Sequence, residues 1–483
     1  MIRAIWCLLL GLLASGGFAP IAKWWLFPTG LAFFMMSTIN QRLRVRMTNS
    51  LLFALGLFAP MLHWSSSFVG SIPWILLTIL CAIFYLPLAL ALKNSRYLWI
   101  VFPAFFVAIE FLRNRIPFGG FAWGRAGYLG VDSPYSELIP YVGVAGGSAL
   151  MALIAVAIYR IMTGFRIYWV PVLILLAFIP AFELDSSGSI TITSIQGNVP
   201  RLGYEISTQV RKVFENHANE TLRASNLSAQ NPPDVYIWPE DGADIDPLKK
   251  GRTEITNLVS QVNAPIIFGS VGKDNLNRPV NLSILWRDGG ASSIYQKQHL
   301  APFGEYIPLR PLAAAVSPLV NQVQDFVPGT SWKYHYVDKA IIAPLICFEV
   351  ADDHLIRQAV SNSNIFIAQT NNATYGRSAQ SRQQLQITRS RALEHHREIA
   401  SISTVGVSAM IDSHGRIISE LEPYTTGSLT ASLKLYEGQS PAGSVGLGIE
   451  YGALTVALMM ILLMALMTLR TRFRARLTRV FRR

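Results

Sequence analysis

Long apolar segments constrain the fold of this 483-residue chain more than any other feature. A helix needs roughly 20 consecutive apolar residues to cross the hydrocarbon core of a bilayer, which is about 30 Å thick. The chain is therefore predicted to be a multi-span membrane protein, and its first apolar stretch is read as a retained helix rather than a signal peptide. We expect eight helical spans, at approximately 4–20, 22–38, 50–68, 73–92, 97–112, 138–159, 167–183 and 450–469.

Basic residues in the short connections predict how these spans are oriented. Lys and Arg in short loops are retained on the cytoplasmic side of the membrane. With the N-terminus inside, fifteen of them fall inside and four outside, and seven of the fifteen are arginines in the last fourteen residues. The polar region after the seventh span is then extracytoplasmic. The arginine tail directly follows an apolar span, so we expect it to meet anionic lipid headgroups rather than nucleic acid.

The polar region has the pattern of an α/β domain. Short apolar runs predict strands that are buried on both faces, and helical spacing recurs between them, as in 207–229 and 380–397. Alternating strands and helices indicate a layered α/β fold. The expected strands include Ile190–Ile195, Val235–Trp238, Pro265–Gly269, Ile341–Ile346 and Ile365–Gln369. We expect transmembrane helices in 1–185, the α/β domain in 186–445, and a last helix with its basic tail in 446–483.

We expect no disulfide framework from the three cysteines. Cys7 and Cys81 lie in expected spans, which leaves Cys347 without a partner. Taken alone, Cys347 is more often a buried structural residue than a nucleophile, because free cysteine is among the most buried residue types.

Three motifs in the α/β domain end or follow expected strands. They are Trp238-Pro-Glu240, the run Tyr295–Glu305 that contains Lys297, and Leu345-Ile-Cys-Phe-Glu349. A thiol becomes a nucleophile as the thiolate, which an acid/base group and a cation can supply near neutral pH. Taken one at a time, Glu240 could be a capping acid and Lys297 a solvated loop charge.

In their order and settings these motifs resemble those of the nitrilase superfamily of carbon–nitrogen hydrolases. Three further runs, Gln196–Pro200, Pro302–Glu305 and Thr370–Arg377, are similar to the apolipoprotein N-acyltransferase branch of that superfamily. The arrangement of seven spans plus one also resembles that branch. The resemblance implies that the extracytoplasmic domain is an α-β-β-α sandwich.

The resemblance also assigns roles to individual residues. Cys347 would be the nucleophile, Glu240 the general acid and base, and Lys297 the cation that stabilises an oxyanion. Glu305 would help to hold Lys297, and Glu349 matches another acidic position that is important in the family.

Two aromatic positions depart from the family's pattern. Phe348 stands where a tyrosine is common, so we expect it to pack but not to transfer protons. Tyr204 is the nearest aromatic residue to a position where the family often has tryptophan.

The implied reaction has a phospholipid as acyl donor and the diacylglyceryl-cysteine of an apolipoprotein as acceptor, at the outer face of a bacterial cytoplasmic membrane. Apolar Pro308–Val327 could dip into the bilayer or simply pack on the domain, and Phe118–Arg125 could form a second wall of a lipid entrance. No cofactor or metal is expected, because His299 and the pair His395-His396 lack the spacing of a second ligand.

Two other functions are weighed against this one. A membrane-anchored amidase or nitrilase would keep the same three residues but would not need the apolar arm. A transporter or scaffold with an inactive nitrilase-like domain is the other, and transport is disfavoured because the spans contain few acidic residues beyond Glu110.

Overall fold

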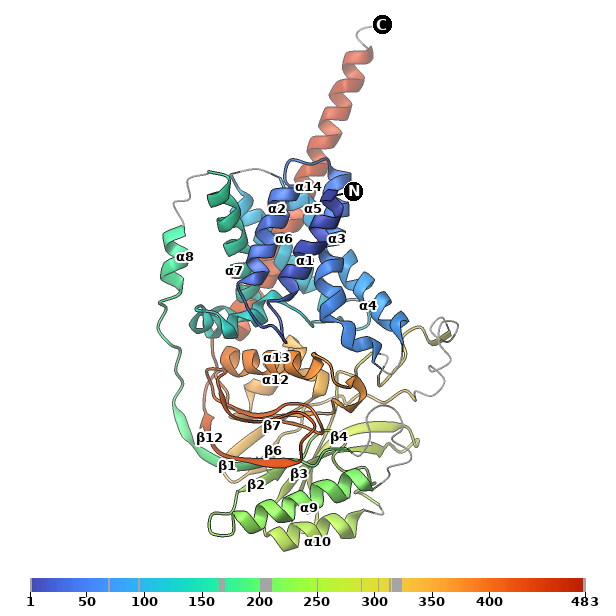
Figure 1. The fold of residues 1–483 in the computed structure, drawn as a ribbon, viewed down its shortest axis with the longest axis vertical. Coiled ribbons are helices and arrows are strands. Elements are labelled where there is room, and N and C mark those ends of the chain that lie inside the picture. The colour runs from blue at the N-terminus through green and yellow to red at the C-terminus, as the bar shows by residue number, and fades with distance from the viewer. Residues whose placement is uncertain are drawn as a thin grey trace.

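The computed structural model separates the chain into a helical bundle and a two-sheet domain, which Figure 1 shows one above the other. The C-terminal helix crosses the bundle and extends beyond it. The structure describes residues 2–67, 70–93, 96–164, 170–199, 211–249, 251–287, 289–302, 304–311, 314 and 324–480, with the side chains of 472–480 excepted.

Nine α-helices form the described part of the bundle. They are α1 (Ile2–Ser15), α2 (Leu26–Thr38), α3 (Leu43–Met61), α4 (Ser71–Ile83), α5 (Leu88–Ala91), α6 (Leu98–Arg113), α7 (Ile139–Met162), α8 (Val170–Leu176) and α14 (Ala442–Val480). Short 3-10 helices lie between them at η1 (His63–Ser66), η2 (Ala126–Asp132) and η3 (Ser136–Leu138).

Within the described residues, three helical stretches are long and apolar enough to cross a membrane. They are Ser71–Ala91, Ser136–Met162 and Ala442–Thr471, and two shorter apolar helices are α1 and α2. In the region of the seventh expected span, helix is described only for α8. The count of eight spans therefore stays a prediction.

Helices α1 and α3 approach each other closely through glycines. A Cβ atom on Gly11 would lie 1.9 Å from the carbonyl oxygen of Phe53, and one on Gly56 would lie 2.0 Å from that of Leu8. Small residues let membrane helices bring their backbones together, so that van der Waals packing can hold them. The first apolar stretch is thus an integral part of the bundle.

The domain consists of two six-stranded sheets. The first has the order β12-β1-β2-β3-β4-β5, and the second has the order β11-β10-β9-β8-β7-β6. In the first sheet the strands are β1 (Ser186–Gln196), β2 (Val235–Ile237), β3 (Ile266–Lys273), β4 (Pro279–Arg287), β5 (Gly290–Gln296) and β12 (Gly427–Tyr436). In the second they are β6 (His335–Val337), β7 (Ala340–Ile346), β8 (Ile365–Thr370), β9 (Ile399–Ser403), β10 (Ser408–Ile411) and β11 (Ile417–Leu421).

Helices cover both outer faces, which gives the four layers of the expected α-β-β-α sandwich. Helices α12 (Asp353–Ser361) and α13 (Gln380–His395) lie between the second sheet and the bundle, and α9 (Lys212–Leu227) and α10 (Arg252–Val262) lie on the far side (Figure 1). Apolar side chains fill the space between the sheets, for example Ile192 and Ile237 from one and Ile342 and Ile367 from the other. The five strands and two helices expected from the sequence are confirmed where the residues are described.

Gly56→Ala should destabilise the bundle, because the added methyl group would collide with a backbone carbonyl that cannot rotate away. Overpacking of this kind costs about 1–3 kcal/mol. The measurement is the thermal unfolding midpoint of the purified chain in detergent. Gly452→Ala on α14 is the matched control, since a Cβ there meets no atom within 4 Å. Equal midpoints for the two variants would contradict the close α1–α3 packing.

Candidate active site

Parallel strands bring the candidate site residues to one edge of the sandwich. Strand β2 pairs in parallel with β1 and β3, and β7 and β8 pair in parallel in the second sheet. Glu240, Cys347 and Asn371 follow the carboxyl ends of β2, β7 and β8, and Lys297 directly follows β5. Residues at strand ends are held by ladders of hydrogen bonds, so the two sheets present these side chains rigidly.

Lys297 is a buried cation between two carboxylates. Its side chain is 1% exposed, and its Nζ lies 3.2 Å from Glu240 Oε1 and 2.8 Å from Glu305 Oε2. Burial by itself would lower the pKa of Lys297, but the charges of Glu240 and Glu305 raise it well above its usual value. The ammonium therefore stays protonated, and both acids orient it. Glu305 contacts Lys297 directly, as the sequence resemblance implied.

Asn281 is a site residue that the sequence did not reveal. From strand β4, its side-chain amide donates to Glu240 Oε1 at 2.8 Å and to Glu305 Oε1 at 2.7 Å. The Asn371 backbone N–H donates to the other oxygen of Glu240 at 2.9 Å. Each acid thus accepts hydrogen bonds from Lys297 or its neighbours, which offsets the desolvation of two buried charges. One asparagine within an apolar strand was the only sequence signal.

Cys347 stands at a sharp bend where β7 turns into the 3-10 helix η6 (Cys347–Ala351). Its φ of 51° lies in the left-handed region, which a non-glycine residue rarely adopts. Its carbonyl oxygen accepts a hydrogen bond of 3.0 Å from the side chain of Gln384 on α13. Helix α13 therefore supports the bend from the side of the bundle.

The surroundings of Cys347 favour the neutral thiol over the thiolate. Burial raises the pKa of this thiol, and the negative charge of Glu240 raises it further, while Lys297 acts in the opposite direction and is outweighed. Cys347 is therefore protonated at neutral pH. The charges of Glu240, Lys297 and Glu305 all act on its sulfur.

Glu349 joins the Cys347 bend to the Lys297 segment. Its Oε2 accepts the Ile346 backbone N–H at 2.8 Å, and its Oε1 accepts the Tyr295 hydroxyl at 2.8 Å and the Gln298 backbone N–H at 2.7 Å. The carboxylate is fully buried, and burial raises its pKa to about 7. Glu349 thus holds these two loops together from within the domain.

Phe348 connects the site to a loop of the bundle. Its ring stacks on Phe121 at 5.9 Å and on Trp123 at 6.4 Å between centroids, with interplanar angles of 16° and 6°. His299 packs edge-on against the same ring at 5.2 Å and pairs with Asp352. The expected packing role of Phe348 is seen, and the segment Phe118–Arg125 lies next to the residue that follows Cys347.

A buried amide ties α13 to the bundle. Gln383 accepts hydrogen bonds from the indole N–H groups of Trp64 at 3.1 Å and Trp123 at 2.7 Å. Its own NH₂ group donates to the carbonyl oxygens of Ala19 and Met61, both at 3.1 Å. All four contacts reach residues of the helical half, so Gln383 anchors the domain to three separate parts of the bundle.

Buried charges reinforce this junction. Arg125, which is fully buried, pairs with Asp353 on α12, with Glu450 on α14 at 3.0 Å and with Glu110 on α6 at 3.6 Å. Arg391 on α13 pairs with Asp353 at 2.6 Å. Removing one member of such a group leaves an uncompensated buried charge, which costs about 3–5 kcal/mol. Sequence reasoning singled out Glu110 but not these partners.

Two predicted features lie outside the described residues. Tyr204 is one of them, and most of Pro308–Val327 is the other. The remaining candidates, Glu240, Lys297, Glu305, Phe348, Glu349 and Cys347, are brought together around the edge of the sandwich.

Comparison with known proteins gives matches to both halves of the chain. Residues 10–157 match the model of the apolipoprotein N-acyltransferase N-terminal domain, and residues 244–440 match that of the carbon–nitrogen hydrolase family. An apolipoprotein N-acyltransferase from Mycolicibacterium smegmatis is 31% identical over 498 residues, covering 93% of this chain and 83% of the relative. One from Shewanella oneidensis is 24% identical over 492 residues, covering 92% of each.

Among solved structures, the chain is similar to a carbon–nitrogen hydrolase from Helicobacter pylori G27. The two are 14% identical with a TM-score of 0.39, and the match covers 51% of this chain and 89% of that one.

Asn281→Ala should destabilise the site, because two buried carboxylates lose a shared donor and repel each other more strongly. We expect a loss of about 1–3 kcal/mol, seen as a lower thermal midpoint, and an altered alkylation rate of Cys347 with iodoacetamide. The control is Asn275→Ala in the exposed turn between β3 and β4. An unchanged midpoint and alkylation rate would exclude the bridging role.

Glu349→Gln should loosen the Lys297 segment. The NH₂ group of a glutamine is a donor. In the variant it would face a backbone N–H that donates to the carboxylate in the parent chain. Hydrogen exchange measured by mass spectrometry should become faster in peptides that contain Ile346 or Gln298, whose backbone N–H groups donate to the two carboxylate oxygens. Glu437→Gln, an exposed acid outside the site, should leave exchange there unchanged. Hydrogen exchange as slow as in the parent chain would argue against this role of Glu349.

Proposed function

This chain belongs to the apolipoprotein N-acyltransferase family, and we propose that it transfers a fatty acyl chain from a membrane phospholipid to an apolipoprotein. The acceptor is the α-amino group of the N-terminal diacylglyceryl-cysteine. The observation that carries the proposal is the 31% identical relative that spans 93% of the chain, including the bundle and the site. A soluble hydrolase would share the second half alone.

In the first stage, the Cys347 sulfur attacks the ester carbonyl of the phospholipid while Glu240 takes the thiol proton. Lys297 stabilises the negative charge that develops on the carbonyl oxygen. The bond between the acyl carbon and the glycerol oxygen then breaks, and Glu240 gives its proton to that oxygen. A lysophospholipid leaves, and the acyl chain remains on Cys347 as a thioester.

In the second stage, the neutral α-amino group attacks the thioester carbonyl. The proton lost by the amine passes to Glu240, the carbon–sulfur bond breaks, and Glu240 returns the proton to the sulfur. The product is an N-acyl amide, and the thiol is restored. Glu240 thus acts as base and then as acid in each half-reaction, which suits a cysteine that rests in its protonated form.

Burial of the cation supports this role for Lys297. In a site with little water, a fixed positive charge stabilises a developing oxyanion more strongly than it would in bulk solvent. Lys297 is held by Glu240 and Glu305, so it needs no reorganisation when the charge appears. The exclusion of water also protects the thioester from hydrolysis between the two stages.

The membrane location follows from the same proposal. We propose that residues 186–445 work at the extracytoplasmic face, between transmembrane helices in 1–185 and a final helix with a cytoplasmic tail in 446–483. The aromatic loop Phe118–Arg125 supports an acyl-chain route from the bilayer, since Phe121 and Trp123 contact Phe348, the residue after the nucleophile.

The proposed reaction needs no cofactor, because Cys347, Glu240 and Lys297 supply the nucleophile, the base and the cation.

A membrane-anchored carbon–nitrogen hydrolase is the second candidate. It is favoured by the match of residues 244–440 to the hydrolase family. The two functions differ in what accepts the acyl group from Cys347, which is an amine in one and water in the other.

Cys347→Ala should abolish acyl transfer while the protein still folds and inserts. Incubated with phospholipid alone, the parent chain should gain the mass of one fatty acid minus one water, measured by intact-mass spectrometry. The alanine variant should gain nothing, because it has no sulfur to acylate. Addition of a diacylglyceryl-cysteine peptide should then remove the label and give N-acyl peptide.

Cys81→Ala is the matched control, since Cys81 is also a buried free cysteine. It should label like the parent chain. Release of free fatty acid only, with no N-acyl peptide, would support the hydrolase instead. Labelling of the Cys347→Ala variant would refute the thioester.

A further inference from the structure

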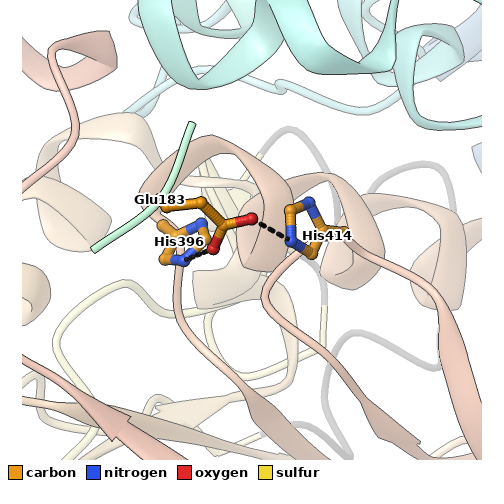
Figure 2. Close-up of side chains that lie close together, drawn as sticks. All are labelled: Glu183, His396 and His414. Atoms are coloured by element: carbon orange, nitrogen blue, oxygen red, sulfur yellow. Dashed lines mark ion pairs between the residues drawn. The ribbon is translucent and has the colours of Figure 1, made fainter. Parts of the chain in front are cut away.

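One carboxylate and two imidazoles, side chains of the kinds that ligate metals, lie together at the junction between the domain and the bundle, away from Cys347. Glu183 belongs to the stretch between α8 and β1, His396 is the residue after α13, and His414 lies in the turn between β10 and β11. Figure 2 shows the Glu183 carboxylate between the two imidazole rings. Its oxygens lie 3.5 Å from His396 Nε2 and 3.2 Å from His414 Nε2.

This cluster is separate from the proposed active site. Helix α13 rises about 1.5 Å per residue, so His396 lies about 18 Å along the chain from Gln384, which supports the Cys347 bend. None of the three side chains contributes to the contacts of Lys297, Glu240 or Glu349 described above. The cluster therefore calls for its own explanation.

His396 is an unsatisfied polar group in the interior. The residue is 0% exposed, and neither ring nitrogen has a hydrogen-bond partner among the residues that the structure describes. Buried polar atoms without partners are rare and costly.

A second carboxylate stands behind His414. Glu137, at the start of the α7 region, places its Oε2 3.7 Å from His414 Nδ1, the nitrogen that does not face Glu183. That oxygen is itself buried without a hydrogen-bond partner in the described part of the chain. A carboxylate on the far nitrogen is the usual arrangement behind a histidine that binds zinc, because it fixes the tautomer and orients the ring.

We propose that Glu183, His396 and His414 bind a divalent transition-metal ion, for which Zn²⁺ fits best. Two imidazoles and one carboxylate are a donor set that zinc accepts, whereas Mg²⁺ and Ca²⁺ prefer oxygen ligands alone. Ligand atoms about 2.0–2.2 Å from a tetrahedral ion lie roughly 3.3–3.6 Å from one another. The 3.2 Å distance is from Glu183 Oε1 to His414 and the 3.5 Å distance is from Oε2 to His396, and one ligand atom from each of the three residues lies within 4.8 Å of the others. A small closing movement would therefore bring the three ligands onto one ion.

Such an ion would fasten the connection between the two halves of the protein. Glu183 lies in the chain that descends from α8 to β1, whereas the two histidines belong to the second-sheet side of the domain. One ion would bind that connection to the domain and, through Glu137, to the start of α7. The sequence expectation of no metal rested on local spacing, and these ligands come from three distant segments.

Zinc binding can be tested on the full chain in detergent, without a histidine tag and in a Cys347→Ala background, so that the active-site thiol cannot bind metal. After removal of metals with EDTA, the protein is titrated with ZnCl₂ by calorimetry, and bound zinc is counted by mass spectrometry. We expect one zinc ion per chain and a higher thermal midpoint with zinc. Both effects should be lost in the His414→Ala variant.

Two further variants sharpen the test. Glu137→Gln should keep the site but weaken its zinc affinity by about 10–100-fold, as expected for loss of a supporting carboxylate. His354→Ala, an exposed histidine on α12, is the matched control and should bind zinc like the parent. The proposal is overturned if the parent binds no stoichiometric zinc, or if His414→Ala binds it with unchanged affinity.

Discussion

The structure of the site depends on one buried cation held between two acids. Placing Lys297, Glu240 and Glu305 together away from water is unfavourable unless each charge finds fixed partners. The fold supplies them from separate elements, with Asn281 on β4 and the Asn371 backbone after β8. This requirement explains why the site needs both sheets, since neither sheet alone carries all of the donors.

The same principle governs the junction between domain and membrane. Helix α13 is covered on one side by the second sheet and on the other by the bundle, so its polar side chains must find partners in both directions. Gln383 and Arg391 do so, one through tryptophan indoles and backbone carbonyls and the other through Asp353. A helix with little apolar character is therefore buried at an interface that also supports the Cys347 bend through Gln384.

Sequence reasoning succeeded where the signal was local. The strand runs before Glu240 and Cys347 were visible as short apolar stretches, and the three motifs identified six of the residues that meet at the site. It missed Asn281, because one amide in a strand carries no pattern of its own. It also missed Glu183 and His414, which lie far apart in the chain. Burial, which raises the pKa of the Cys347 thiol, is likewise not visible in sequence spacing, and the generation of the thiolate by Glu240 stays a prediction.

The ion pairs of Arg125 limit how the domain and the bundle of such proteins can be exchanged between relatives. Its three acidic partners reside on α6, α12 and α14, so the helices before the domain, the domain itself and the helix after it share one set of charges. Grafting the domain onto a foreign bundle would take Arg125 away from Asp353 and leave it with Arg391 alone among the cations described above. The two halves are consequently not interchangeable modules, and we expect their charge partners to be inherited as a unit.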